Sequence, residues 1–354
     1  MLEQSELFTA GEGGYNTYRI PALAVTASGR ILALCEGRRD SRSDSGQIDL
    51  LARHSDDGGC TWSDARVVVT EPEMTSGNPC PVVDLQTGRI LLPFCKNLAA
   101  GPESMICEGK APRTVWLTHS DDDGMTWNAA REITEQAKKP EWTWYATGPC
   151  HGIQLIGDSA PGRLVVPCDH MIGVYHDRER DPYHSHVIIS DDGGDTWSIG
   201  GVVEEGTNEC ALVEIDDGSL YINCRNYRGE KRRAAARSHD AGESFESRAW
   251  VDEHPEPICQ GAMTSWPMSG GGRDRVLFSN PASQNAREGL TIRTSHDGGQ
   301  AWPDARCLYE GPSAYSDLAI TATDEILCLY ERGAAAAYET LTLARFDSAW
   351  LAGE

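Results

Sequence analysis

The sequence has no apolar run long enough to cross a membrane, and its first residues, MLEQSELFTAGEGG, lack a basic start followed by an apolar stretch. A transmembrane helix needs about 20 mainly apolar residues, and a secretory signal needs both of the missing features. We therefore expect no membrane insertion. The expected location is the cytoplasm, or the cell exterior if a signal has been trimmed from a secreted protein.

Positive charge is scarce, because 31 Lys and Arg residues face 54 Asp and Glu residues, for a formal net charge of −23. Nucleic acids and anionic membrane surfaces bind to basic faces. We therefore exclude both as partners. A site for an anionic ligand would need a local group of cations inside this acidic chain.

The 12 cysteines include no C-x-x-C pair, which argues against a zinc site. Several of them, including Cys35, Cys95, Cys224 and Cys328, lie in apolar strand-like runs. Free cysteine packs there as a small hydrophobic side chain. We expect buried thiols in place of disulfides.

A turn motif of the form S-x-D-x-G-x-[TS]-[WF] recurs along the chain. Its five copies are SDDGGCTW at 55–62, SDDDGMTW at 120–127, SDDGGDTW at 190–197, SHDAGESF at 238–245 and SHDGGQAW at 295–302. Ser and Asp side chains bond to nearby backbone amides, and Gly permits a positive φ. The motif therefore predicts five hairpin turns, and its role is structural, since such turns also occur without catalysis.

A second repeat consists of an apolar strand, a polar turn and another apolar strand, and it occurs six times. The copies begin near residues 20, 79, 151, 210, 263 and 318. Together with the turn motif, this pattern predicts an all-β chain folded as a six-bladed β-propeller with four antiparallel strands per blade. Residues 1–354 then form a single domain, with LTLARFDSAWL closing the ring and a turn of helix at Glu132–Lys139.

Four arginines occur where propeller strands converge on one face of the central axis: Arg19, Arg38, Arg225 and Arg287. Several cations aimed at one point are costly to hold together unless an anion lies between them. A guanidinium binds a carboxylate through two parallel hydrogen bonds. The cluster therefore predicts recognition of a carboxylate or a phosphate.

Tyr315 and Glu209 open the sixth and fourth repeats at this face. A phenol with an ordinary pKa near 10 is a poor nucleophile, and a carboxylate within reach activates it by accepting its proton. The loop RRDSRSDSGQIDL offers a general acid. Asp44 is the better placed acid, Asp40 is the reserve, and Asp49 is expected to be structural because it begins the strand IDLLA.

Over nearly the whole chain, the motifs resemble those of exo-sialidases, the glycoside hydrolases that include bacterial and animal cytosolic enzymes. The resemblance is carried by YRIP, EGR, D-x-G-x-I-D-L, NEC, N-x-R-N-Y, R-x-x-L-T-x-R and YSDL. It implies retaining hydrolysis of a terminal α-linked sialic acid from sialylated glycans, through a covalent tyrosyl–sugar intermediate and with no metal or other cofactor.

The resemblance also implies a role for each residue of the site. These roles are carboxylate binding by Arg19, Arg225 and Arg287; acid/base catalysis by Asp44; nucleophilic attack by Tyr315 paired with Glu209; orientation of Arg19 by Glu331; and contacts to O4, the N-acyl group and the glycerol tail by Arg38, Asn78 and Gln260, respectively.

The sequence departs from the family at Asp169, His170 and Met171, where animal cytosolic enzymes carry tyrosines. This departure leaves open a preference for the deaminated sugar or another ulosonic acid. Two further alternatives are an enzyme that transfers the sugar, including to an internal anhydro product, and a non-catalytic glycan-binding propeller. The last does not need Glu209 and Tyr315 together with Asp44. No pattern marks a self-complementary surface for an oligomer.

Overall fold

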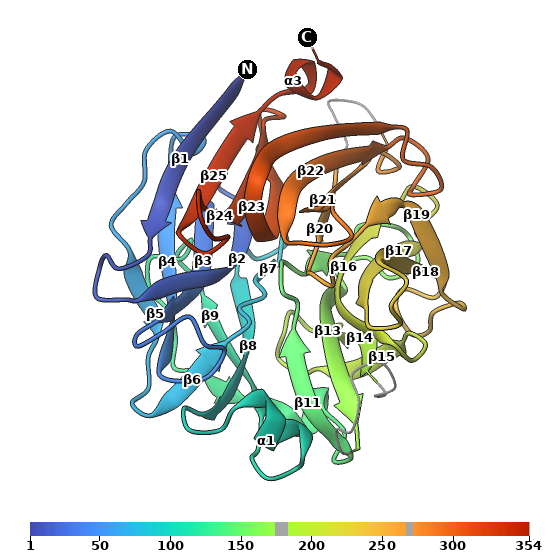
Figure 1. Cartoon of the computed structure of the whole chain (residues 1–354). Coiled ribbons are helices and arrows are strands. Elements are labelled where there is room, and N and C mark those ends of the chain that lie inside the picture. The colour runs from blue at the N-terminus through green and yellow to red at the C-terminus, as the bar shows by residue number, and fades with distance from the viewer. Residues whose placement is uncertain (174–182, 267–271, 354) are drawn as a thin grey trace.

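The regular secondary structure of the chain is almost entirely β-strand, as the computed structural model shows for residues 1–173, 183–266 and 272–353 (Figure 1). The prediction of an all-β chain is confirmed. The strands form antiparallel groups that follow one another in chain order, from the blue to the red end of the chain in Figure 1.

The first two groups are joined into one sheet by a parallel contact between their strands β4 and β6. The first group consists of β2 (Thr17–Val25), β3 (Ile31–Arg38), β4 (Ile48–Ser55) and β5 (Arg66–Val69). The second consists of β6 (Met74–Gly77), β7 (Val82–Val83), β8 (Ile90–Leu98), β9 (Thr114–Ser120) and β10 (Arg131–Glu132).

The next two groups are separate sheets. The third group consists of β11 (Trp142–Thr147), β12 (Ile153–Gln154), β13 (Leu164–Ile172), β14 (Tyr183–Ser190) and β15 (Ser198–Val202). The fourth consists of β16 (Thr207–Glu214), β17 (Leu220–Asn226), β18 (Arg232–Ser238) and β19 (Ala249–Pro255).

The last two groups share the long strand β23, whose first part pairs with β22 and whose second part pairs with β24. The strands are β20 (Ala262–Ser265), β21 (Val276–Pro281), β22 (Glu288–Ser295), β23 (Asp304–Ile320), β24 (Ile326–Arg332), β25 (Thr340–Phe346) and, from the N-terminus, β1 (Leu2–Thr9). The pairing of β1 with β25 is not predicted by the repeats; it places the N-terminal strand, and not the C-terminal segment, at the outer edge of the last group.

Three short helices complete the described residues: α1 (Glu103–Cys107), α2 (Thr134–Ala137) and α3 (Ser348–Ala352). Helix α2 lies within the segment predicted to form a helical turn. Among the described residues, no helix is long and apolar enough to cross a membrane.

The five repeated turns share one hydrogen-bond pattern. In the first copy, the hydroxyl of Ser55 donates to Oδ1 of Asp57 at 2.8 Å and accepts from the amide of Gly59 at 2.9 Å. The same two bonds occur in the other four copies. Hydrogen bonds from Thr61 hold the pKa of Asp57 at about 2, so this carboxylate stays ionised and ties the turn together. The predicted structural role of the motif is confirmed.

Apolar residues fill the interfaces between consecutive groups. One cluster joins Leu32 of the first group to Phe94 of the second, and another joins Leu277 of the fifth to Leu318 of the sixth. A further cluster joins the last group back to the first. All 12 cysteines are free thiols and ten of them are buried, as predicted.

Candidate active site

Irregular pairing near the start of β2 and β16, and within β23, turns side chains toward a common cavity. The register shifts just before Ala22 in β2, Cys210 in β16 and Ser316 in β23. A bulge places two residues opposite one and re-aims their side chains. Consequently Asn208 and Glu209, although adjacent in the sequence, both line the cavity.

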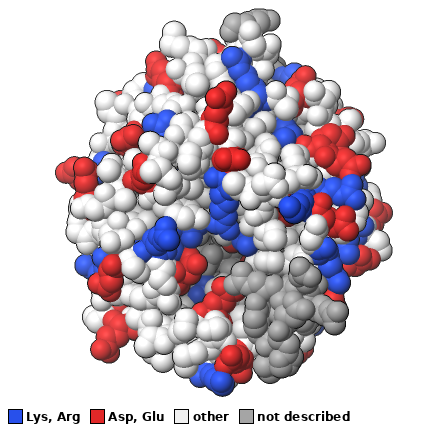
Figure 2. All heavy atoms as spheres, viewed as in Figure 1, with Lys and Arg blue, Asp and Glu red and all other residues white. Residues whose placement is uncertain are grey.

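The cavity encloses about 170 Å³ and is lined mainly by charged and polar side chains. It brings together eight residues predicted from the sequence, namely Arg19, Arg38, Asp44, Asn78, Glu209, Arg225, Arg287 and Tyr315. Figure 2 shows positive and negative side chains meeting around a hollow near the centre of one face.

Tyr315, Glu209 and Arg225 form a hydrogen-bonded triad at the floor of the cavity. The hydroxyl of Tyr315 donates to Oε1 of Glu209 at 2.5 Å and accepts from Nη1 of Arg225 at 3.1 Å. Arg225 also donates to Oε2 of Glu209 at 2.6 Å. Burial and the charge of Glu209 raise the pKa of Tyr315 well above its usual value, so the free protein holds a neutral phenol beside a carboxylate.

Glu331 fixes both Arg19 and the backbone of Tyr315. Its carboxylate accepts from Nε of Arg19 at 3.0 Å, and from Nη2 of Arg19 at 3.3 Å, in a two-point ion pair. It also accepts from the amides of Ile20 and Tyr315 at 3.0 and 3.1 Å. The fully buried Glu331 therefore ties β24 to β2 and β23 and fixes the guanidinium of Arg19, which lines the cavity.

Asp44 bridges two of the predicted arginines. Its Oδ1 lies 2.7 Å from Nη1 of Arg38 and 3.1 Å from Nη1 of Arg19. Burial opposes ionisation of Asp44, but Arg38 and Arg19 outweigh it and lower the pKa of the carboxyl. The side chain is nevertheless 64% exposed, because it stands on the loop between β3 and β4. Asp44 therefore occupies guanidinium groups that a bound carboxylate would also contact.

Arg287 differs from the other three arginines in its partners. Its guanidinium donates to the hydroxyl of Tyr338 at 2.9 Å and to the carbonyl of Ile258 at 3.2 Å. It lies 5.5 Å from the centre of the Tyr315 ring. Within the described parts of the chain it has no ion pair, whereas Arg19, Arg38 and Arg225 each pair with a carboxylate. Arg287 is therefore the arginine of the cluster whose charge is left for a bound anion to neutralise.

The opposite wall of the cavity is built around Arg113, which sequence analysis missed. Arg113 donates to Oδ1 of Asn78 and to Oδ1 of Asn97, each at 2.5 Å, and its guanidinium lies 4.2 Å from the centre of the Trp144 ring. The repeats, which identify the other residues of the site, do not mark this wall, because Arg113 and Trp144 lie outside the positions that the repeats make equivalent.

Asp169 lies at the base of this wall. Its Oδ1 accepts from the side-chain Nδ2 of Asn208 at 2.8 Å, and its buried Oδ2 has no partner among the described residues. Burial, together with the charge of Glu209, raises the pKa of Asp169 well above its usual value, so a neutral carboxyl is favoured there.

Glu36 is a second residue that sequence analysis missed, although a signal for it exists. It stands two positions before Arg38 in β3, and alternate residues of a strand share a face. Its carboxylate accepts from Arg38 at 2.7 Å and from the amide of Asn78 at 2.8 Å. A side chain on Gly77 would come within 2.6 Å of Glu36, which explains the glycine.

Gln260 does not lie where the sequence interpretation places it. It is fully buried, does not line the cavity, and uses its amide group within the protein. Its nitrogen donates to the carbonyls of Pro149 and Ser316 at 3.0 Å, and its oxygen accepts from the amide of Ser316. Because Ser316 follows Tyr315, the expected contact to a glycerol tail is corrected to support of the strand that carries Tyr315.

The two other aspartates of the loop also differ from Asp44. Asp49 is fully buried and accepts hydrogen bonds from Tyr15 and Thr70, each at 2.8 Å, as expected of a structural residue. Asp40 is exposed and does not line the cavity. Asp44 is therefore the member of this loop that lies in the site.

Residues 29–327 match the family model described as "BNR repeat-like domain". Bovine sialidase-3 (Bos taurus) is 30% identical over 385 residues, which cover 93% of this chain and 89% of the relative. The chain belongs to the sialidase family.

Bacterial sialidases are similarly related to the chain. A sialidase of Micromonospora viridifaciens is 30% identical over 370 residues, covering 100% of this chain and 55% of the relative. A sialidase of Bacteroides fragilis is 30% identical over 356 residues, covering 92% of this chain and 62% of the relative. The chain thus spans little more than half the length of these two sialidases.

Solved sialidase structures have the same fold. The Hadza microbial sialidase Hz136 aligns with a TM-score of 0.85 and 28% identity over 98% of this chain and 68% of its own. The intramolecular trans-sialidase of Ruminococcus gnavus, solved with oseltamivir carboxylate, aligns with a TM-score of 0.80 and 20% identity over 98% of both chains.

Proposed function

We propose that the protein is an exo-α-sialidase that removes a terminal α-linked sialic acid from sialylated glycans with retention of configuration. The observation that carries this proposal is the pairing of Tyr315 with Glu209 inside a cavity lined by four arginines. A neutral phenol suits attack beside an anionic substituent, because a carboxylate nucleophile would be repelled by the carboxylate of the sugar.

The arginines account for binding of the sugar. The carboxylate of the substrate is held by Arg19, Arg225 and Arg287, and the unpaired charge of Arg287 supports this assignment. Binding also requires Asp44 to release Arg19, since both carboxylates compete for the same guanidinium. Once released from its ion pairs, Asp44 regains a higher pKa and can hold the proton that the leaving group needs.

In the first half of the reaction, the oxygen of Tyr315 forms a bond to the anomeric carbon as the bond to the leaving oxygen breaks. Glu209 takes the phenolic proton, which the short contact between the two groups favours. Asp44 gives its proton to the leaving oxygen. In the second half, a water molecule attacks the anomeric carbon as the bond from that carbon to the oxygen of Tyr315 breaks; ionised Asp44 takes a proton from the water, and Glu209 returns the phenolic proton to the departing oxygen of Tyr315.

We further propose that the six strand groups are the blades of a six-bladed β-propeller. The proposal is supported by the apolar clusters between consecutive groups and by the cluster that joins the last group to the first. It is also supported by the convergence on one cavity of side chains from β2, β16 and β23.

The experiment that tests the function is incubation of the protein with an aryl α-sialoside and with its deaminated analogue, followed by proton NMR of the products. Release of the α-anomer of the free sugar as the first product supports retaining hydrolysis. Release of an internal anhydro sugar would assign the chain to intramolecular transfer, and release of neither aglycone would contradict the enzymatic function.

A further inference from the structure

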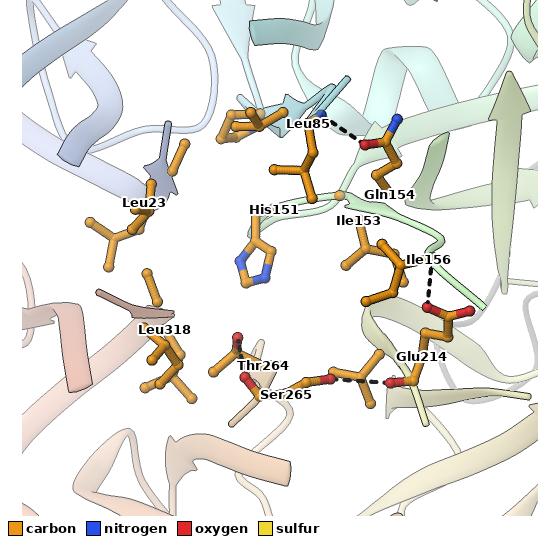
Figure 3. Close-up of a pocket in the computed structure, with 18 of the residues that line it drawn as sticks. Leu23, Leu85, His151, Ile153, Gln154, Ile156, Glu214, Thr264, Ser265 and Leu318 are labelled. Atoms are coloured by element: carbon orange, nitrogen blue, oxygen red, sulfur yellow. Dashed lines mark hydrogen bonds between the residues drawn. The ribbon is translucent and has the colours of Figure 1, made fainter. Parts of the chain in front are cut away.

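A second cavity, of about 390 Å³, lies toward the C-terminal ends of β2, β16 and β23 (Figure 3). It shares no lining residue with the arginine cavity. On β2, for example, Arg19 lines the first cavity and Leu23 the second, and on β16 the same holds for Glu209 and Val213. Four residues of a strand span about 13 Å, so the two cavities are separate sites.

The wall of this second cavity is mainly aliphatic. Figure 3 shows Leu23, Leu85, Ile153, Ile156 and Leu318 arranged around it. At its rim, Leu85 and Ile156 are 56% and 62% exposed, although large aliphatic side chains are normally covered. A concave, apolar surface with an exposed apolar rim is typical of a small-molecule site.

Gln154 and Glu214, two polar side chains of the wall, are engaged within the protein. Gln154 accepts from the amide of Leu85 at 2.7 Å, and Glu214 accepts from the amide of Ile156 at 2.9 Å and from Arg273 at 2.6 Å. Because the charges of Glu214 and Arg273 cancel, the wall offers no net charge to a ligand. Burying an ion against such a wall would be costly, which favours an uncharged ligand.

His151 is the exception, because its ring points into the cavity (Figure 3). Its Nδ1 lies 2.8 Å from Oδ1 of the fully buried Asp317. Asp317 also accepts from the amides of Leu23 and Leu318, each at 2.8 Å, so both of its oxygens act as acceptors and Nδ1 is the donor in its contact with His151. No partner of Nε2 occurs within the described residues.

The protonation of His151 sets what this free nitrogen can bind. Burial by itself lowers the pKa of His151, but Asp317 outweighs burial and raises it above the ordinary value. In its protonated form the imidazole presents an N–H at Nε2, and Asp317 lies beside it to balance the charge. The cavity therefore combines apolar walls with a hydrogen-bond donor on His151.

We propose that this cavity binds a small uncharged molecule that has an apolar body and a single hydrogen-bond acceptor, with the acceptor bonded to Nε2 of His151. The apolar body fills the space between the aliphatic side chains. The acceptor gives the bound molecule its orientation, as single polar groups do in apolar pockets.

The test compares two fluorinated probes of nearly equal shape, 4-fluoroacetophenone and 1-ethyl-4-fluorobenzene, titrated into the whole protein and followed by fluorine NMR. We expect both to bind and the ketone to bind about tenfold or more tightly, since only it can accept a hydrogen bond from a charged group. In the wild-type protein, the nitrogen resonance of His151 Nε2 should shift with the ketone and stay in place with the hydrocarbon.

His151→Asn is the matched variant, because the amide nitrogen of Asn can still donate to Asp317 while the second ring nitrogen is lost. The affinity ratio of the two probes should fall to about one. Ile156→Glu, at the exposed rim, should weaken both probes. Equal affinities for the wild-type protein, absence of binding at millimolar concentration, or displacement of the probes by a sialic acid glycal would overturn the proposal.

Discussion

The hydroxyl of Tyr315 lies 2.5 Å from Oε1 of Glu209, although the two residues are 106 positions apart in the chain. Arg225 contacts both groups and holds them in one hydrogen-bonded triad. Tyr315 on β23 and Glu209 on β16 are nearly buried residues, with exposed fractions of 6% and 8%. A proton can therefore pass between them without crossing bulk water.

Replacing Glu209 by Gln removes the proton acceptor while keeping the size of the side chain. We expect kcat to fall about 10²–10⁴-fold, the usual contribution of a general base. Steady-state kinetics on an aryl sialoside measures the effect, with the exposed Glu310→Gln as the control that should retain wild-type kcat. A decrease of less than a few fold would remove Glu209 from the chemical step.

Arg287→Lys keeps the positive charge and loses the planar fork that matches a carboxylate. We expect kcat/KM to fall about tenfold or more, because a charge-assisted hydrogen bond contributes about 1.5–3 kcal/mol. Arg89→Lys, which changes an exposed ion pair with Asp121, is the control and should have no effect. If both variants kept wild-type kcat/KM, Arg287 would not contact the substrate.

The ion pairs of Asp44 make a prediction about pH. A general acid must be protonated, and Arg38 and Arg19 lower the pKa of Asp44 in the free protein. The alkaline limb that Asp44 imposes on kcat/KM should therefore lie at lower pH than the limb of kcat, which reports the substrate complex where Asp44 has left Arg19. Limbs at the same pH would contradict this rearrangement.

The acid role of Asp44 has its own test, which uses two leaving groups. Asp44→Ala should lower kcat/KM about 10²–10⁴-fold for a poorly leaving alcohol and much less for a nitrophenol. The exposed Asp40→Ala, from the same loop, should behave as wild type with both substrates. Equal losses with both leaving groups in the Asp44 variant would assign it to binding.

Gln260→Ala distinguishes structural support from substrate contact. The variant leaves the amide of Ser316 and the carbonyls of Pro149 and Ser316 without their side-chain partner, so we expect a loss of about 1–3 kcal/mol in the free energy of unfolding. KM should stay within about twofold of wild type in the folded protein. Urea unfolding and kinetics measure both, with the exposed Gln300→Ala as control. A raised KM with unchanged stability would restore a contact to the sugar.

Local sequence patterns predict the features of this fold that local interactions determine. The five turns form their bonds within seven residues, as between Ser55, Asp57 and Gly59, so each copy specifies its own structure. The six strand–turn–strand repeats then predict that Tyr315 and Glu209 meet, because both residues stand at equivalent positions, at the start of their repeats.

The remaining features depend on contacts that no local pattern encodes. The pairing of β1 with β25 joins the two ends of the chain, and Arg113 reaches Asn78 from a loop outside the repeat frame. Asp44 also meets Arg19 through the tertiary fold, so its lowered pKa was not evident from the loop sequence. The resemblance to the family places Gln260 at the site, but the backbone groups of Pro149 and Ser316 determine the orientation of its side chain.

Attack of Tyr315 on the sugar can be detected by covalent trapping of the intermediate. A 3-fluorosialosyl fluoride, whose adduct hydrolyses slowly, is incubated with the protein, and the digested peptides are analysed by mass spectrometry. We expect one sugar adduct, on Tyr315, and none in Tyr315→Phe. An adduct on any other residue, or rapid turnover of an aryl sialoside by Tyr315→Phe, would contradict it.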